Sequence, residues 1–270
     1  MRQQVTINSQ LSEVKDFISL LKPRVMSLVV FTGLIGMLIA PGNIHPLIAT
    51  IAIICITFGS GASGAINMWY ERELDAKMSR TKNRPLPQGK ISAQAALDFA
   101  GVLAFTSVFL MAFAVNVMAA FLLLCAILFY VFIYTIWLKP RTPQNIVIGG
   151  AAGAFPPLIG WAAVAGDISL MPVLLFIITF LWTPPHFWAL ALYKNEDYKM
   201  AGIPMMPVIY GAAETKKQML LYTVALVAFS LMPYFIGFSG FIYLAVAALS
   251  GGNFLHHAVK VYKQPSESNC

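Results

Sequence analysis

Three oxygen-bearing side chains recur at a helical spacing in the segment NMWYERELDAKMSRTKNRPLPQGK, residues 67–90. Asn67, Glu71 and Asp75 follow one another at four-residue intervals, and a helix of about 3.6 residues per turn places such residues on one face. Mg2+ takes oxygen ligands, keeps several waters, and is commonly held by one or two carboxylates together with substrate phosphates. Asn67, Glu71 and Asp75, here called the polar ladder, therefore predict a magnesium site.

Basic residues follow the polar ladder directly. Lys77, Arg80, Lys82 and Arg84 can hold phosphate oxygens through charge-assisted hydrogen bonds, which are bidentate for arginine. The alternative is a solvated loop whose charges set the membrane topology and form surface ion pairs worth about 0–1 kcal/mol each. Spacing alone leaves both interpretations open. The position, where an apolar run meets water, suits a substrate with a diphosphate head and a lipid tail.

A second group of ionisable residues lies in the segment WTPPHFWALALYKNEDYKMAGIPMMP. Its candidate side chains are His186, Tyr193, Lys194, Glu196 and Asp197. Pro184 and Pro185 kink or break a helix just before His186, and His186 and Asp197 are about three helical turns apart, on nearly the same face. An ionisable group at the end of an apolar span is a functional candidate, although a lone histidine is as often a hydrogen-bonded packing residue.

The rest of the chain predicts the elements that must position these residues. Of its 270 residues, 59% are hydrophobic and 11% are charged, which exceeds what one soluble core can bury and indicates a polytopic membrane protein. Apolar runs of about 20 residues can cross a bilayer. The predicted spans are 24–41, 47–66, 94–113, 116–137, 145–165, 169–192, 217–234 and 236–254. Their interiors carry almost no charge, which argues against a transporter or channel.

The predicted organisation is one domain over residues 1–270. Residues 1–22 form an interfacial segment, in which Leu11, Val14, Ile18 and Leu21 share one helical face. Residues 67–93 and 193–216 form the two catalytic loops. No cleavable signal peptide is apparent, so the first span directs insertion.

Charge placement predicts the orientation. All 18 Lys and Arg residues fall in the N-terminal segment, the two catalytic loops, the connection near residue 140 and the C-terminal tail, and none lies in the loops near 42–46, 166–168 and 235–239. Basic residues collect on the cytoplasmic side, so the N-terminus and both catalytic loops are expected there. The net charge of +7 thus reports topology and not nucleic-acid binding. The three cysteines form no disulfide framework or metal motif.

The two motifs together, with LLKPRVMSLVVFTGLIGM at 20–37, resemble the bacterial protoheme IX farnesyltransferase family of the UbiA-type intramembrane prenyltransferases, and the similarity extends to about residue 210. The resemblance implies an all-α bundle of nine transmembrane helices around a cavity, with Mg2+ and diphosphate at its cytoplasmic mouth. It implies transfer of farnesyl from farnesyl diphosphate to a vinyl group of heme b, a substrate and not a prosthetic group, giving heme O in the bacterial inner membrane. A related enzyme with an aromatic or quinone-precursor acceptor is the alternative.

The resemblance also implies roles for individual residues. The metal ligands would be Asn67, Glu71, Asp75 and Asp197, and Met68 stands where the superfamily motif usually has its first aspartate. The catalytic set adds His186, Tyr193 and Lys194. Substrate binding falls to Lys77, Arg80, Arg84, Trp69 and Arg24.

Further expectations follow from the same resemblance. Tyr193 and Trp69 would stabilise an allylic cation with their ring faces, although interfacial anchoring suits both equally. His186 would serve as a heme ligand or as an acid or base. The downstream heme A synthase is an expected partner. The chain ends after the eighth span, so a truncated C-terminus is expected.

Overall fold

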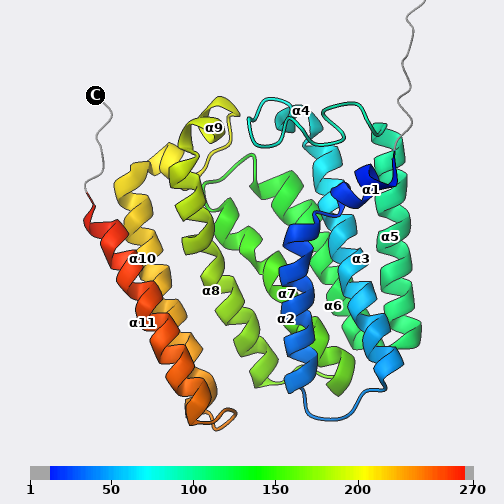
Figure 1. Cartoon of the computed structure of the whole chain (residues 1–270), viewed down its shortest axis with the longest axis vertical. Helices are drawn as coiled ribbons and strands as arrows, with labels where there is room; N and C mark the ends of the chain where they lie inside the picture. The colour runs from blue at the N-terminus through cyan, green and yellow to red at the C-terminus, as the bar shows by residue number, and fades with distance from the viewer. Residues whose placement is uncertain (1–12, 265–270) are drawn as a thin grey trace, which may run out of the picture.

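The computed structural model describes residues 13–264 and contains only helices over that range (Figure 1). The predicted all-α class is confirmed. The helices are α1 (Val14–Leu20), α2 (Pro23–Ile39), α3 (Pro46–Tyr70), α4 (Arg72–Asp75), α5 (Ala93–Ala114), α6 (Val117–Leu128), η1 (Phe129–Leu138), α7 (Asn145–Ala165), α8 (Leu170–Tyr193), α9 (Asn195–Met200), α10 (Met206–Phe235) and α11 (Phe241–Lys263).

Each of the eight predicted spans falls largely in a helix, but fewer helices meet the length and apolarity needed to cross a membrane. In the described range six do: α3, α5, α6 with η1, α7, α8 and α10. Helix α2 has 17 residues and counts as a seventh only together with α1, from which it is bent by 55°. The eighth predicted span falls in α11, whose second half carries Asn253, His256 and His257. These polar residues lower its apolarity, so the prediction of eight spans is corrected to six or seven.

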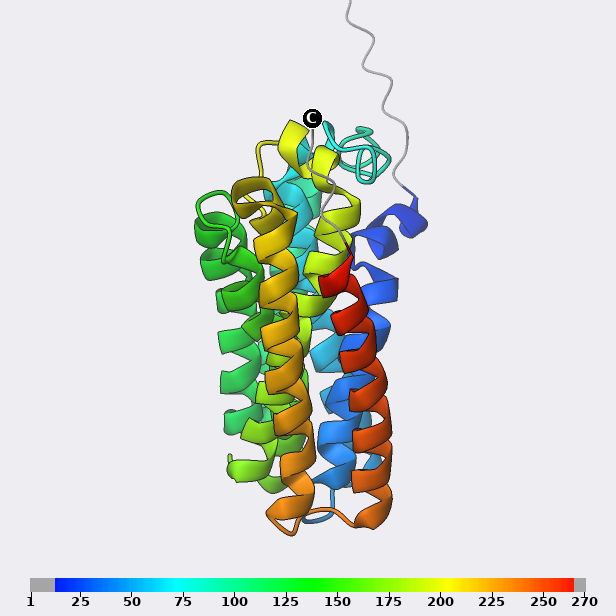
Figure 2. The same cartoon turned by 90° about the vertical axis from the view of Figure 1, so that its left-hand side faces the viewer.

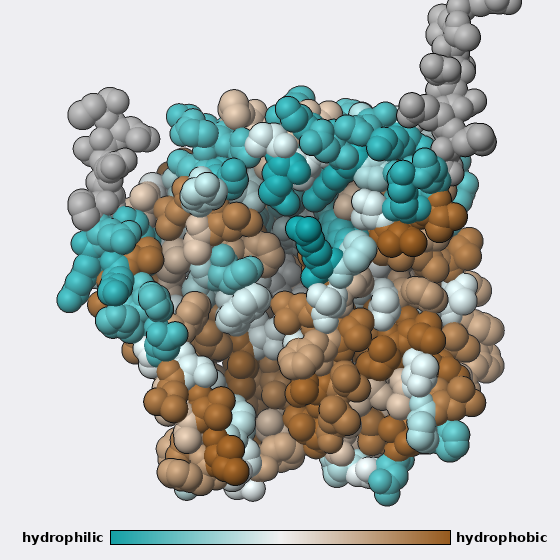
Figure 3. All heavy atoms as spheres, viewed as in Figure 1, coloured by the Kyte–Doolittle hydropathy of each residue, from teal (hydrophilic) through white to brown (hydrophobic). Residues whose placement is uncertain are grey.

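The long helices run side by side, and the short helices α1, α4 and α9 gather at one end (Figures 1 and 2). Helix α7 packs against α2, α3, α6, η1 and α8, while α10 joins α8 to α11. On the face drawn in Figure 3, hydrophobic residues cover most of the surface below the end that carries α4 and α9, and hydrophilic residues cover that end. This distribution suits a multi-pass membrane protein, because the apolar sides can face lipid tails while the polar end faces water.

Glycines let α2 and α7 approach closely. A Cβ added at Gly36 would overlap the backbone of Pro157, and one at Gly160 would overlap the carbonyl oxygen of Gly33. Small residues allow this kind of backbone contact inside a bilayer. The first span is thereby fixed against the middle of the bundle.

The span predicted at 116–137 changes its helix type halfway. It is α-helical as α6 and becomes a ten-residue π-helix, η1, with i→i+5 hydrogen bonding. A π-helix has about 4.4 residues per turn instead of about 3.6. The nine residue steps from Tyr130 to Lys139 therefore make about two full turns, where an α-helix would make about two and a half. The π-helix places Tyr130 and Lys139 on one face, and an α-helix would have placed them on opposite faces.

The predicted loops contain more helix than expected. The loop expected at 193–216 includes α9 and the start of α10, which is interrupted at Gly211, where φ is +77°. The segment expected to lie in the interface contains the short helix α1, and its interfacial position stays a prediction; residues 1–12 of that segment lie outside the described residues. Lys22 stands at the bend between α1 and α2 in a left-handed conformation, with φ of +53°.

Candidate active site

The polar ladder keeps its helical spacing across a break between two helices. Asn67 lies in the last turn of α3, Glu71 has φ of −91° and ψ of 8° at the junction, and Asp75 ends α4. The Glu71 amide still donates to the Asn67 carbonyl at 3.0 Å, and the Asp75 amide donates to the Glu71 carbonyl at 2.8 Å. The three side chains are 3%, 6% and 2% exposed. They form a buried row of oxygen acceptors at the polar end of the bundle.

Each member of the polar ladder meets one basic side chain from elsewhere in the chain. Lys22 Nζ donates to Asn67 Oδ1 at 2.7 Å. Lys139 Nζ lies 2.5 Å from the Glu71 carboxylate, and Arg84 Nη1 lies 2.6 Å from Asp75 Oδ2. Buried charges need such partners, because desolvating an unpaired one is costly.

The bend before α2, the end of η1 and the loop after α4 thus meet at the ladder. The pKa of Lys22 is lowered to about 7. Burial is the largest cause, and repulsion from Arg84 and Lys139 adds to it. Three cationic side chains and three oxygen acceptors therefore share one small site.

The π-helix η1 is tied to the polar ladder by Thr135. Its hydroxyl accepts a hydrogen bond from Asn67 Nδ2 at 3.3 Å and donates to the Tyr130 carbonyl oxygen at 2.8 Å. Both bonds are buried or partly buried. They hold η1 in register with the end of α3.

The second motif reaches the first through the loop after α4. Ser79 Oγ donates to Asp197 Oδ2 at 2.6 Å, and Met78 packs in a hydrophobic cluster with Trp188 and Tyr198. Asp197, on α9, is therefore linked to the segment that carries Arg84. The two motifs, about 120 residues apart in the sequence, are neighbours at one end of the bundle (Figure 1).

Other predicted site residues lie apart from the polar ladder. Tyr193 is 80% exposed, and Lys194 Nζ lies 5.0 Å from the centre of its ring. Trp69 packs beside a cluster that includes Leu20 and Met68, with the Arg72 guanidinium over its ring. His186 is exposed on α8 and stacks on Trp182 at 4.3 Å.

The remaining predicted phosphate contacts are open to solvent. Arg24, Lys77 and Arg80 are exposed, and their side chains make no hydrogen bond or ion pair within residues 13–264. Arg84 alone among the predicted substrate-binding residues contacts the ladder directly. The roles assigned to the others stay predictions.

Sequence reasoning missed five side chains around the ladder, namely Lys22, Lys139, Tyr130, Tyr134 and Thr135. In the sequence, Lys22 and Lys139 stand out only as charges that set topology. The tyrosines and Thr135 lie inside an apolar run whose helix type the sequence pattern did not reveal. No local signal marks them, because their partners lie 45 and 68 residues away in the chain.

The donors present suit Mg2+ held jointly with a phosphate ligand. Within the described range, no three His, Cys, Asp or Glu side chains are grouped to hold a metal by themselves. The polar ladder supplies two carboxylates and one amide oxygen. Mg2+ is typically bound by so few protein ligands when substrate phosphates and water complete its octahedron, so the residues fit this ion.

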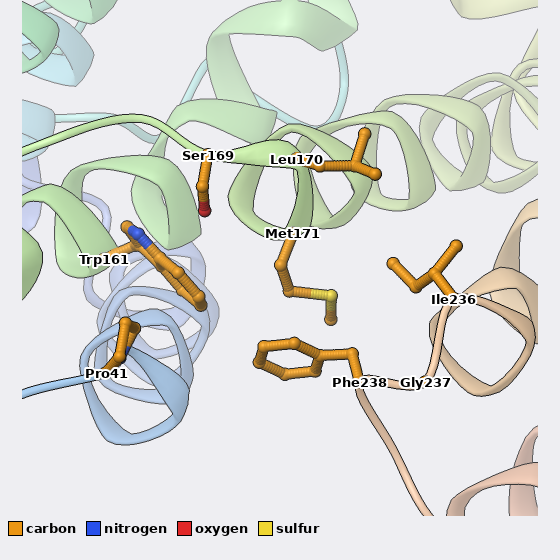
Figure 4. A pocket seen from close by; sticks show the side chains of 8 residues that line it. All are labelled: Pro41, Trp161, Ser169, Leu170, Met171, Ile236, Gly237 and Phe238. Atoms are coloured by element: carbon orange, nitrogen blue, oxygen red, sulfur yellow. The ribbon is translucent and has the colours of Figure 1, made fainter.

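A cleft of about 380 Å3 lies at the opposite end of the bundle (Figure 4). Its walls are Pro41, Trp161, Ser169, Leu170, Met171, Ile236, Gly237 and Phe238. None of these side chains is charged. The cleft therefore lacks the groups needed to bind a diphosphate, and the candidate site remains at the polar ladder.

The fold and the site define a multi-pass helical membrane protein with a buried acid-and-base cluster where its apolar bundle meets water. The UbiA prenyltransferase family model matches residues 29–270, and the chain belongs to that family. This confirms the resemblance predicted from the two motifs.

Several curated relatives carry the name protoheme IX farnesyltransferase. The chain is 54% identical to the protein from Parvibaculum lavamentivorans, covering 94% of this chain and 80% of the relative. It is 57% identical to the one from Rickettsia bellii, covering 93% and 84%. It is 56% identical to the one from Rhodopseudomonas palustris, covering 94% and 82%.

Solved structures share the fold. A digeranylgeranylglyceryl phosphate synthase superposes with a TM-score of 0.79 at 24% identity, covering 94% of this chain and 89% of that chain. A UbiA homolog from Archaeoglobus fulgidus bound to DMAPP and Mg2+ gives 0.76 at 17% identity, with the same coverage. These likenesses confirm the bundle architecture.

Proposed function

We propose that this chain transfers the farnesyl group of farnesyl diphosphate to a vinyl group of heme b, giving heme O and diphosphate. The names of relatives more than half identical to it support the choice of donor and acceptor. The observation that carries the proposal is the buried polar ladder, in which each oxygen acceptor faces one cation. That arrangement suits a metal-bound diphosphate.

The polar ladder is the proposed metal platform. Asn67, Glu71 and Asp75 would hold Mg2+, with Asp197 contributing from α9, and the bound ion would act as a Lewis acid on the diphosphate. The link from Ser79 to Asp197 supports a contribution from the second motif, because it brings α9 beside the loop that follows the ladder.

The cations beside the ladder would neutralise the negative charge of the departing diphosphate. Lys139 and Arg84 pair with carboxylates in the protein alone, and both can turn to phosphate oxygens once those carboxylates bind metal. Positive groups held in place before the reaction stabilise the charge that develops on the leaving oxygen. Lys22 would add a third contact from the bend before α2.

The apolar bundle below the ladder suits the rest of the substrate. It would hold the farnesyl chain and keep water away from the reacting carbon until the new C–C bond forms. His186, exposed on α8, is the proposed contact for heme. The charge distribution supports a cytoplasmic location for the ladder, in a bacterial-type inner membrane.

The direct test is product analysis with the purified protein. Incubation with heme b, farnesyl diphosphate and Mg2+ is expected to give heme O by mass spectrometry. 4-Hydroxybenzoate, offered in place of heme b, serves as the competing acceptor. Prenylation of the benzoate without formation of heme O would overturn the proposed acceptor while leaving the prenyltransferase class intact.

A further inference from the structure

The loop after α4 makes a tight turn directly beyond the polar ladder. The Thr81 hydroxyl donates to the Asp75 carbonyl oxygen at 2.9 Å. The amides of Thr81 and Lys82 donate to the Met78 carbonyl oxygen at 3.1 and 3.0 Å. Thr81 is 1% exposed, so its bond to Asp75 is shielded from water. The turn over residues 75–82 is therefore fixed to the last member of the polar ladder.

This turn contacts the second motif through two neighbouring side chains. Met78 is 4% exposed and packs in the hydrophobic cluster that includes Trp188 of α8 and Tyr198 of α9. Ser79 Oγ donates to Asp197 Oδ2 at 2.6 Å. The loop after α4 and helix α9 accordingly lie beside each other at the polar end of the bundle (Figure 1).

Helix α9 itself provides little to hold Asp197. It has six residues, and its N-cap residue Lys194 makes no side-chain cap hydrogen bond. A helix this short depends on tertiary contacts for its stability. Within residues 13–264, the Asp197 carboxylate forms no ion pair and accepts a hydrogen bond from Ser79 alone. The orientation of this carboxylate therefore depends on Ser79.

The hydrogen bond engages one carboxylate oxygen and leaves the other available. A serine hydroxyl has a single hydrogen to donate, and Asp197 Oδ2 receives it. The separation of 2.6 Å is typical of a hydroxyl bound to a charged acceptor. Because a carboxylate accepts on both oxygens, Oδ1 can bind a cation while Oδ2 stays bonded to Ser79.

Ser79 is also placed to set the spacing between the two motifs. It lies four residues beyond Asp75, in the turn that Thr81 fixes to the ladder. The hydroxyl therefore connects the Asp197 carboxylate to the backbone that carries Asp75. Outer partners that orient metal ligands in this way typically change metal affinity by about 10- to 100-fold.

We propose that Ser79 is a positioning residue, whose hydroxyl orients the Asp197 carboxylate so that both motifs bind one metal–diphosphate unit. This inference rests on the proposed function. Ser79 touches neither the metal nor the substrate in this role and acts through Asp197. No local sequence pattern marks it, because the two residues are 118 positions apart.

Metal titration without turnover tests the proposal. Mn2+ replaces Mg2+, a non-reacting thio analogue of farnesyl diphosphate supplies the phosphates, and EPR spectroscopy measures the free Mn2+. We expect Ser79→Ala to raise the Kd for Mn2+ by about 10-fold or more. Ser79→Thr keeps a hydroxyl and should remain within about threefold of the parent. An unchanged Kd in Ser79→Ala would overturn the inference.

Asn83→Ala provides the matched control. Asn83 is exposed in the same loop, and in the described structure its side chain bonds to Gln88 alone. This variant should leave the Kd for Mn2+ unchanged. Thermal unfolding without metal should give one midpoint for all three variants, because each changes an exposed side chain. Equal increases in Kd for Ser79→Ala and Asn83→Ala would contradict a specific role for Ser79.

A double-mutant cycle shows whether Ser79 acts through Asp197. Asp197→Ala alone should weaken Mn2+ binding, because it removes a carboxylate ligand. Adding Ser79→Ala should then change the Kd by less than about twofold, since the carboxylate that Ser79 orients is absent. Additive effects of the two changes would refute the inference.

Heme O formation is measured in parallel at limiting and at saturating Mg2+. Ser79→Ala should lose activity at limiting Mg2+ and return to within about threefold of the parent at saturation. A raised Kd in Ser79→Ala without heme O from the parent would contradict the proposed acceptor and leave this inference standing. Heme O from the parent with an unchanged Kd in Ser79→Ala would contradict this inference alone. A parent protein that neither binds Mn2+ with the analogue nor forms heme O would overturn both.

Discussion

At the scale of single residues, the polar ladder works as three acceptors that are each matched to one cation. Glu71 and Asp75 are almost fully buried, and Lys139 and Arg84 reach them from separate segments. Charges in such surroundings depend on their partners, because either one left alone would be buried without compensation. The two carboxylate–cation pairs are therefore neutral as a set, and the same groups can rearrange around a diphosphate.

Asp75→Asn tests the ladder as a metal platform while keeping its size. We expect heme O formation to fall by at least about 100-fold, because a neutral amide weakens both metal binding and charge stabilisation. Asp98→Asn is the control, since Asp98 lies on α5 and bonds only to Gln94 in the described structure. Near-normal turnover in Asp75→Asn would rule out the assigned role.

Lys139→Met tests the pairing itself. The change leaves Glu71 buried without its cation, and we expect the free energy of unfolding to fall by about 3 kcal/mol. The measurement is thermal or denaturant unfolding in detergent. Adding Glu71→Gln should restore much of the stability and none of the activity. If the single variant proved as stable as the parent, the ion pair would not contribute to the stability of the fold.

At the scale of elements, two backbone features position the site. The π-helix η1 rotates Lys139 onto the same face as Tyr130, and the junction of α3 with α4 keeps the ladder spacing despite the break. The contact of α2 with α7 at Gly33, Gly36 and Gly160 fixes α2 against the middle of the bundle. The π-helix and the junction depart from regular α-helical geometry, and the contact between α2 and α7 depends on glycines that place no side chain between the two helices.

Gly160→Ala should separate α2 from α7. The added methyl group would overlap backbone, which cannot move aside as a flexible side chain can, so we expect a loss of about 1–3 kcal/mol in unfolding free energy. Gly153→Ala, two turns away on the same helix face, meets open space and should be neutral or slightly stabilising. Equal stabilities for the two variants would contradict the close packing.

At the scale of the whole molecule, charge and hydropathy distinguish the polar end of the bundle from its apolar sides. The apolar sides of the bundle leave many large side chains exposed, such as Phe105 and Phe113, which suits contact with lipid. The polar end holds both motifs and the candidate active site (Figure 3). A donor with a charged head and a lipid tail can therefore bind with each part in a matching environment.

Cysteine labelling tests the proposed orientation. In a protein whose native cysteines are replaced, Asn43→Cys lies in an exposed loop at the end opposite the ladder, and Gln88→Cys lies in the loop that follows it. A membrane-impermeant thiol reagent added to intact spheroplasts should label position 43 alone, and both positions after permeabilisation. The reverse pattern would invert the topology.

The sequence alone determined the helical class, the approximate spans, the shared side of the basic loops and the spacing of the polar ladder. These follow from hydropathy, charge and periodicity, which are properties of neighbouring residues. The confirmed family resemblance came from the two motifs in the same way. The span predicted at 236–254 overstates the apolarity of α11, because the polar second half of this helix follows directly on its apolar start.

Only the tertiary structure decided what surrounds the ladder. Lys22 and Lys139 find their acceptors across 45 and 68 residues of chain, and Tyr134 of the π-helix lies against Gly149 of α7. Tyr193 is exposed, and Trp69 packs against the cluster that includes Leu20 and Met68, although the spacing of both residues placed them close to the ladder. Such pairings depend on which helices pack together, and no local pattern encodes that.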